Sequence, residues 1–240
     1  MMRNICGQRI PVESRGEGVG FGSGVGPYLG SGRWGSSRWG FAERTLAGGA
    51  FLRDVLGASI TGYAGLFRVP ERLPTLELSD GRKVYYREIR PEDQAALQRF
   101  HSRMSERSIR LRFFGPKPEL SEKQARYFSH LNGRRAALVA LDPEDPAEII
   151  GVVRFDQEGE DGPAEYAAAI EDRYQGRGLG LQLTRKLMDL ARERGVREIY
   201  AYVMPDNRPM TITLKRLGLP THIRWEEGLQ RVELSLQASE

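Results

Sequence analysis

Residues 164–190 read AEYAAAIEDRYQGRGLGLQLTRKLMDL, and this stretch decides the fold. It opens with small and apolar residues of strand character that run to Ile170. A glycine-rich turn from Gln175 to Gly180 follows, and Leu183 and Leu187 beyond it recur at the spacing of an amphipathic helix. The order of strand, glycine turn and helix is typical of proteins that cover a sheet with helices.

The glycine turn favours anion binding for a physical reason. Glycines let the backbone turn tightly and bring consecutive N–H groups together, at the point where the positive end of the helix dipole lies. A diphosphate is the expected ligand, although a plain strand-to-helix turn would also use such glycines. Two common phosphate motifs do not fit, because the dinucleotide pattern G-x-G-x-x-G needs glycine where Leu181 stands, and the Gly-Lys-Ser/Thr of a P-loop is absent.

Strand patterns on both sides of this stretch predict a mixed sheet. Asp142-Pro143 and Gly162-Pro163 supply turns that suit antiparallel hairpins. We therefore predict an α/β (α+β) fold with a mixed, mostly antiparallel sheet flanked by helices, in the order β-α-α-β-β-β-α-β-α-β. The predicted strands cover residues 82–89, 136–141, 149–155, 164–170, 199–203 and 229–236.

Two helices are predicted between the first two strands. Pro91 suits the first position of a helix that carries Phe100 and Met104 on its apolar side. Ser121 and Gln124 have the spacing of a capping box, which predicts the start of the second helix.

Glycine and charge divide the chain into two parts. Residues 1–75 hold 16 of the 28 glycines and carry 9 basic against 5 acidic residues, whereas the remainder carries 27 of each. Because each glycine raises the entropy cost of ordering the backbone, we predict a disordered, flexible Gly/Ser/Arg-rich tail and linker over 1–75, with a short helix around Leu52 to Leu56, and a folded domain over 76–240. Trp34 and Trp39 beside arginines leave tail contact with nucleic acid as an alternative of little support, so nucleic acid is not an expected partner.

The composition excludes several classes of protein. The single cysteine, Cys6, cannot form an internal disulfide. The chain has only three histidines in addition, which argues against a structural zinc site. No apolar run has the length of a membrane span, and the first eight residues lack the apolar centre of a secretory signal. We therefore expect a cytoplasmic protein with no metal and no membrane partner; its oligomeric state is open.

The deciding stretch and its neighbours resemble the GNAT N-acetyltransferase superfamily. The family's Arg/Gln-x-x-Gly-x-Gly/Ala motif is matched by Gln175, Gly178 and Gly180. The resemblance covers roughly residues 78–236 and is closer still to the acetyltransferase domain of bacterial Pat-type protein lysine acetyltransferases. The shared motifs are Arg87-Glu88-Ile89-Arg90-Pro91-Glu92-Asp93, Arg112-Phe113-Phe114, Leu120-Ser121-Glu122-Lys123, Arg134 to Ala140, Ala164-Glu165, Tyr174 to Gly180, and Asn207-Arg208-x-Met210 followed by Leu217-Gly218.

The resemblance implies acetyl-CoA as the co-substrate, bound between the strand that ends at Ile170 and the strand over 199–203. It implies that amides of the glycine turn hold the diphosphate and that backbone groups of the strand pair with the pantetheine arm, although small residues beneath a helix would also explain the alanines. The resemblance implies that Asn207 contacts the cofactor, although Asn207 would also suit an ordinary helix start. It implies that Arg216 pairs with the CoA phosphates, although Arg216 could also be an exposed helix residue. The implied cofactor-binding residues are Ala168, Ala169, Ile170, Gln175, Gly176, Arg177, Gly178, Leu179, Gly180, Leu181, Asn207 and Arg216.

Glu165 is the candidate general base. An amine must lose a proton when it attacks a thioester, and ordinary pKa values of about 10.4 for Lys and 4.3 for Glu make direct transfer uphill. Burial would narrow this gap, and a water relay is an alternative. Pat-type enzymes carry their base at the matching position, whereas a solvent-facing glutamate on an edge strand is the other interpretation. Leu214 stands where many family members place a tyrosine acid, so we expect solvent to protonate the leaving thiolate.

Three functions remain open at this point. The first is transfer of acetyl to lysine side chains of acceptor proteins, the second is transfer to a small amine, and the third is a non-catalytic acyl-CoA-binding sensor. The acidic residues between Asp156 and Asp161 would attract a cationic acceptor or simply form a solvated turn.

Overall fold

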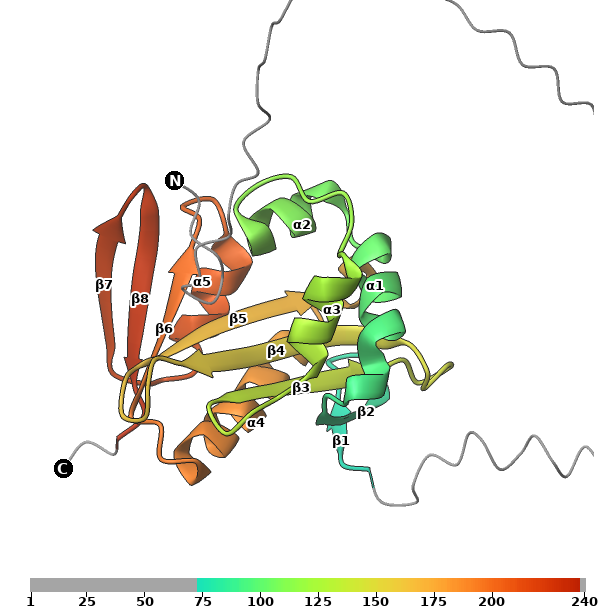
Figure 1. Cartoon of the computed structure of the whole chain (residues 1–240), viewed down its shortest axis with the longest axis horizontal. Coiled ribbons are helices and arrows are strands. Elements are labelled where there is room, and N and C mark those ends of the chain that lie inside the picture. Colours follow the sequence, from blue (N-terminus) through green and yellow to red (C-terminus); the bar gives the residue numbers. More distant parts are fainter. Residues whose placement is uncertain (1–72, 238–240) are drawn as a thin grey trace, which may run out of the picture. The chain divides into compact units, whose positions relative to one another are not determined.

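The computed structural model describes residues 73–237, which form one eight-stranded sheet with helices on both faces (Figure 1). The strand order is β1-β2-β3-β4-β5-β6-β8-β7, and every neighbouring pair is antiparallel except β5 and β6. This confirms the predicted mixed, mostly antiparallel sheet. The predicted tail up to residue 72 and the helix around Leu52 to Leu56 lie outside the described residues. The strands are β1 (Thr75–Glu77), β2 (Lys83–Glu88), β3 (Arg135–Leu141), β4 (Ile149–Gln157), β5 (Ala164–Ile170), β6 (Glu198–Val203), β7 (Thr221–Glu226) and β8 (Leu229–Ser235).

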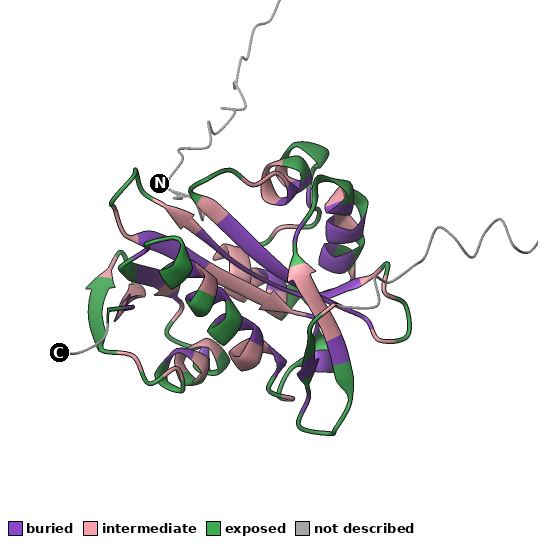
Figure 2. Ribbon diagram, turned by 90° about the horizontal axis from the view of Figure 1, so that it is seen from below, coloured by how far each residue is buried: buried purple, intermediate pink, exposed green. Residues whose placement is uncertain are grey.

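The central strands are buried on both faces. Alternate residues of β3 point to opposite sides, so Leu138 packs in the apolar cluster that includes Leu183 of α4, and Val139 packs in the cluster that includes Phe100 of α1. Figure 2 shows this burial along the strands, while the outer sides of the helices are exposed. No helix within residues 73–237 is long and apolar enough to cross a membrane. The helices are α1 (Gln94–Arg103), α2 (Glu106–Phe113), α3 (Glu122–Ser129), α4 (Leu179–Glu193) and α5 (Arg208–Lys215).

The segment before α3 differs from the single helix that we predicted there. The extended backbone of Met104 (ψ 144°) ends α1, so Met104 is the C-cap and lies just outside the helix, although it packs in the same apolar cluster as Phe100 as predicted. A separate helix, α2, begins at Ser105, whose hydroxyl accepts a hydrogen bond from the Ser108 amide at 3.2 Å. Because α2 buries only Ile109, it lacks the apolar stripe that would have predicted it.

The two edge strands were also missed. β1 is three residues long, and five of the six residues of β7 are exposed, so neither strand shows an alternating pattern. The capping box at Ser121 and Gln124 is confirmed: the Ser121 hydroxyl accepts from the Gln124 amide, and the Gln124 side chain accepts from the Ser121 amide.

Candidate active site

A cavity of about 460 Å³ opens where β5 and β6 separate. The pairing of these parallel strands covers only Ala164 with Ile199 and Glu165 with Tyr200. Further along β5, residues 168–170 line the cavity. An extended ligand can therefore lie along the edge of β5 and bond to its backbone.

The glycine turn gives the cavity an end suited to an anion. Gly176 (φ 70°) and Gly178 (φ 83°) adopt left-handed backbone conformations that side chains disfavour. Gly178 is the N-cap of the fifteen-residue helix α4. Because glycine has no side chain, the N-cap residue offers no hydrogen-bond acceptor to the first backbone amides of the helix. A phosphate group at this position would supply the missing acceptor.

Side-chain bonds hold the turn against its surroundings. The side-chain amide nitrogen (Nε2) of Gln175 donates to the backbone oxygen of Ile170 at 2.9 Å and to the hydroxyl of Ser108 at 3.0 Å. The buried Tyr174 donates its hydroxyl to Asp142 at 3.2 Å. The turn is thereby tied both to β5 and to α2.

Ten of the twelve predicted cofactor-binding residues line the cavity. Arg177 does not, because its guanidinium forms an ion pair with Asp80 at 2.7 Å, and Leu179 does not, because its side chain is fully buried in the core. The ten that line the cavity are Ala168, Ala169, Ile170, Gln175, Gly176, Gly178, Gly180, Leu181, Asn207 and Arg216.

Asn207 and Arg216 lie at the two ends of α5. The Asn207 side-chain oxygen accepts from the Met210 amide at 3.2 Å, so this residue both starts the helix and lines the cavity. Arg216 is exposed and accepts a hydrogen bond through its backbone oxygen from Arg185 at 3.1 Å. Asn207 is therefore a helix start that also lines the cavity, and its contact with the cofactor stays a prediction.

The cavity also has walls that the sequence analysis missed. Helix α2 contributes Ser108, Leu111 and Arg112, and α5 contributes Met210 and Ile212 among others. The motif Arg112-Phe113-Phe114, which this chain shares with Pat-type enzymes, was the available signal for α2.

Glu165 lies beside this cavity in a buried position. Its side chain is on a strand paired on both sides, with 6% of the residue exposed, so the interpretation as a solvent-facing edge residue was wrong. It lines a second cavity of about 20 Å³, whose wall shares Leu111 and Arg112 with the larger one. Within residues 73–237 its carboxyl makes no hydrogen bond or ion pair.

Burial is the main reason that the pKa of Glu165 rises to about 8. The positive charge of Arg112 opposes this rise, whereas the charges of Asp156 and Glu158 add to it. These two neighbours are themselves fixed by phenols: Tyr127 donates to Asp156 at 2.8 Å, and Tyr200 donates to Glu158 at 2.5 Å. The surroundings of Glu165 therefore favour the protonated form of its carboxyl more than water does.

The position expected for a tyrosine acid offers no proton. Leu214 is buried in the core, with 1% exposed. Tyr166 lines the larger cavity, but its hydroxyl is buried against Thr184 at 2.7 Å, and burial raises its pKa to about 12. No group of three or more His, Cys, Asp or Glu residues in the described part of the chain is placed to hold a metal ion.

The chain is similar to known acetyltransferases and acyltransferases. An acetyltransferase of Pseudomonas aeruginosa is 36% identical over 143 residues, which cover 59% of this chain and 77% of that protein. The GNAT domain of S. lividans PAT is 31% identical with a TM-score of 0.62, over 68% of this chain and 96% of that one. A cAMP-binding acyltransferase from Mycobacterium smegmatis is 25% identical with a TM-score of 0.50, over 70% of this chain and 48% of that one.

The sequence profile of the acetyltransferase (GNAT) domain matches residues 83–220. The chain belongs to the GNAT acetyltransferase family and is an N-acetyltransferase of that type. Members of the family use acetyl-CoA, and the uncapped start of α4 beside the edge of β5 fits its diphosphate and its extended arm.

Proposed function

We propose that this protein acetylates lysine side chains of acceptor proteins by direct transfer from acetyl-CoA, with Glu165 as general base. The observation that carries the proposal is the buried carboxyl of Glu165, which lacks a hydrogen-bond partner within residues 73–237 and lies between the cavity and a cluster of phenol-bonded carboxylates. A carboxyl of this kind is suited to exchange a proton with a ligand.

The cofactor-binding residues are assigned by the same proposal. The amides of Gly178, Leu179 and Gly180 would hold the diphosphate, and the backbone of residues 168–170 would hold the pantetheine arm. Gln175 keeps the turn on β5, and Arg216 at the cavity mouth offers a positive charge to the phosphates. Acetyl-CoA, when bound, supplies the acetyl group as an activated thioester.

Glu165 performs the proton transfer that the amine requires. As the amine nitrogen forms its bond to the acetyl carbon, the carboxylate of Glu165 takes a proton from that nitrogen. With a pKa of about 8, Glu165 is closer to a lysine ammonium in acidity than an ordinary carboxyl is. Because Leu214 offers no proton, the departing thiolate is left to take one from solvent.

A protein acceptor is favoured over a small amine by two resemblances. The motifs resemble Pat-type protein lysine acetyltransferases, and the fold is similar to the GNAT domain of S. lividans PAT over 96% of that domain. One cysteine in 240 residues suits a reducing compartment, so we propose a cytoplasmic location.

Glu165→Gln tests the proposal, because it keeps the shape of the side chain and removes the base. Turnover of lysine-containing proteins should fall by about 10²- to 10⁴-fold, while calorimetry should show acetyl-CoA affinity nearly unchanged. The wild-type rate should rise as the pH approaches 8, since the base acts only when deprotonated. The variant should lose this acidic limb and keep only the rise at higher pH that comes from deprotonation of the lysine amine, whose ordinary pKa is about 10.4.

Glu160→Gln is the matched control, since it makes the same substitution at an exposed glutamate in the turn after β4, which is not among the charges named above as acting on Glu165. It should change the acceptor KM at most. Normal turnover by Glu165→Gln would assign proton removal to another group. A wild type that binds acetyl-CoA but acetylates neither proteins nor small amines would favour the sensor.

A further inference from the structure

Helix α2 covers one side of the cavity with very little apolar packing. Of its eight residues only Ile109 is buried. Yet α2 supplies Leu111 and Arg112, which line both the larger cavity and the small cavity of Glu165. Its apolar contact with the core is limited to Ile109 and the partly buried Phe113, so polar bonds are needed to fix this helix in place.

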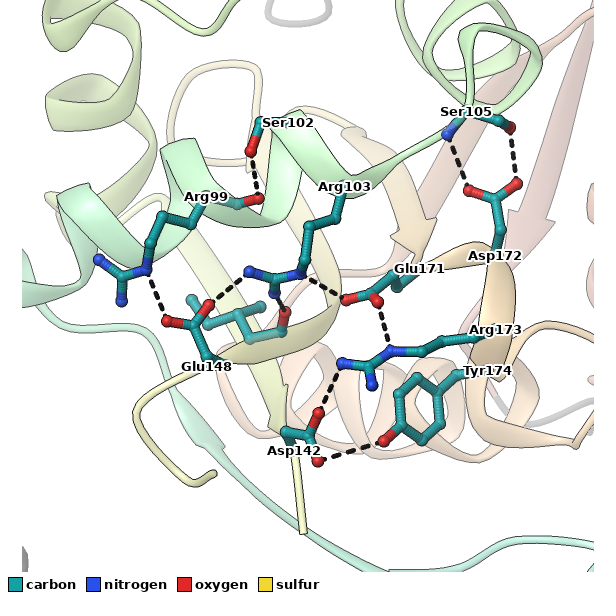
Figure 3. Close-up of polar contacts among 11 residues, drawn as sticks. Arg99, Ser102, Arg103, Ser105, Asp142, Glu148, Glu171, Asp172, Arg173 and Tyr174 are labelled. Carbon is teal, nitrogen blue, oxygen red and sulfur yellow. Dashed lines mark hydrogen bonds and ion pairs between the residues drawn. The ribbon is translucent and has the colours of Figure 1, made fainter. Parts of the chain in front are cut away.

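The side chain of Asp172, just after β5, makes the bonds that fix the start of α2 (Figure 3). One carboxylate oxygen accepts from the Ser105 amide at 2.9 Å. The other oxygen accepts from the Ser105 hydroxyl at 2.6 Å and from the Ser108 hydroxyl at 2.9 Å. Burial alone would raise the pKa of Asp172, but these hydrogen bonds hold it below its ordinary value. The carboxylate is thus ionised, and its bonds are of the strong, charge-assisted kind.

The segment that carries Asp172 is itself held firmly. The preceding residue, Glu171, is buried and accepts from Arg103 at 3.0 Å and from Arg173 at 2.5 Å. Arg173 also donates to the buried Asp142 at 2.6 Å, as Figure 3 shows. Asp172 therefore ties a loosely packed helix to a rigid part of the molecule.

We propose that Asp172 is a positioning residue for the transfer reaction, because it fixes the first turn of α2 and through that helix places Leu111 and Arg112 beside Glu165. The inference rests on the proposed role of Glu165 for one measurement only, the pH dependence of the rate. Asp172 would act mainly on the acceptor side of the site, since the glycine turn keeps its bond from Gln175 to Ile170 of β5 even if the bond from Gln175 to Ser108 of α2 is lost.

The electrostatic setting of Glu165 provides that readout. The charged and titratable groups that act on it are Arg112 of α2, Arg154 and Asp156 of β4, Glu158 after β4, and Tyr200 of β6. Among these, only Arg112 lies on a helix held by Asp172. If α2 moves, the positive charge of Arg112 leaves Glu165, and the pKa of Glu165 rises further.

The test compares Asp172→Ala, Asp172→Asn and Ser108→Ala in the full chain. Asp172→Ala should raise the acceptor KM by roughly tenfold to a hundredfold, the scale of a small misplacement of site groups, with acetyl-CoA affinity nearly unchanged. It should also move the acidic limb of the rate to higher pH. Asp172→Asn should lie between wild type and Asp172→Ala, because its amide oxygen still accepts from the serine hydroxyls but its NH₂ cannot accept from the Ser105 amide.

Asp145→Ala is the matched control, since it removes another hydrogen-bonded, exposed aspartate from a loop that lines neither cavity. It should leave both readouts at wild-type values. Wild-type values for Asp172→Ala and Ser108→Ala would overturn the inference even if Glu165→Gln confirms the base.

Should Glu165→Gln instead disprove the base, the acceptor KM and the amide hydrogen exchange of α2 decide the inference alone. Faster exchange over residues 106–113 together with a raised acceptor KM would support it. Unchanged exchange would overturn it.

Discussion

Helices α4 and α2 both border the cavity, but α4 is held there mainly by apolar packing in the core, whereas α2 is held largely by hydrogen bonds. Six of the fifteen residues of α4 are buried, among them Leu183 and Leu187, against one of eight in α2. Apolar packing contributes in proportion to the area buried, while each bond between α2 and Asp172 depends on the placement of two polar groups.

This difference separates the two ends of the cavity. The end at α4 offers the backbone amides that we propose to bind the diphosphate, and the core fixes them. The end at α2 lies beside Glu165 and has a single buried residue, Ile109. Local stability is expected to be high at the first end and low at the second.

The largest expected effect comes from removing an apolar side chain from α4. Leu187 is fully buried, so Leu187→Ala should lower the free energy of unfolding by about 2–5 kcal/mol. Ile109→Ala on α2 should cost no more than about 2 kcal/mol, the low end of that range, because its neighbourhood can relax. Urea unfolding followed by circular dichroism measures both. Equal losses would show that α2 belongs to the core and would remove the comparison.

The same contrast explains which elements the sequence could predict. Leu183 and Leu187 form the apolar stripe of α4 because that helix packs against the sheet. The buried side of the helix is therefore visible in the sequence as a repeating apolar pattern. In α2 the positions of Leu111 and Arg112 depend on bonds to Asp172, which is more than sixty residues away in the chain. Local sequence patterns cannot reveal hydrogen bonds between residues so far apart in the chain. Strand β7 was missed for another reason, because its side chains are exposed on both faces.

The site was predicted to a similar extent. The glycine turn and residues 168–170 are contiguous, so their place at the cavity follows from a local motif. The burial of Glu165 and its raised pKa could not be read from the chain, since they depend on α2 and on Asp156, its pairing partner on the neighbouring strand β4. Local sequence therefore indicates the glycine-turn end of the cavity, and tertiary packing makes the surroundings of Glu165.

A second variant tests the rigid end directly. Gly178→Asp places a side chain at φ 83° and a carboxylate at the start of α4, so acetyl-CoA affinity measured by calorimetry should fall by about a hundredfold or more. Gly195→Asp is the matched control, because Gly195 has a φ of 77° at the other end of the helix and open space around it. It introduces the same backbone strain and should leave affinity unchanged. If both variants bind acetyl-CoA like the wild type, the diphosphate does not lie at this turn.

The smallest effect is expected at the second polar tether of α2. Arg110 forms an ion pair with Asp206 in the loop after β6, and its hydrogen bond is the main reason that the pKa of Asp206 is lowered. Both side chains are exposed, so water and salt screen the pair. Arg110→Ala and Asp206→Ala should each change the acceptor KM by less than about fivefold, and added salt should reduce this change. A change as large as that of Asp172→Ala would mean that α2 is held equally from both sides of the cavity. Asp172 would then be one of two comparable anchors, and the helix would span the site as a bridge instead of being fixed at one end.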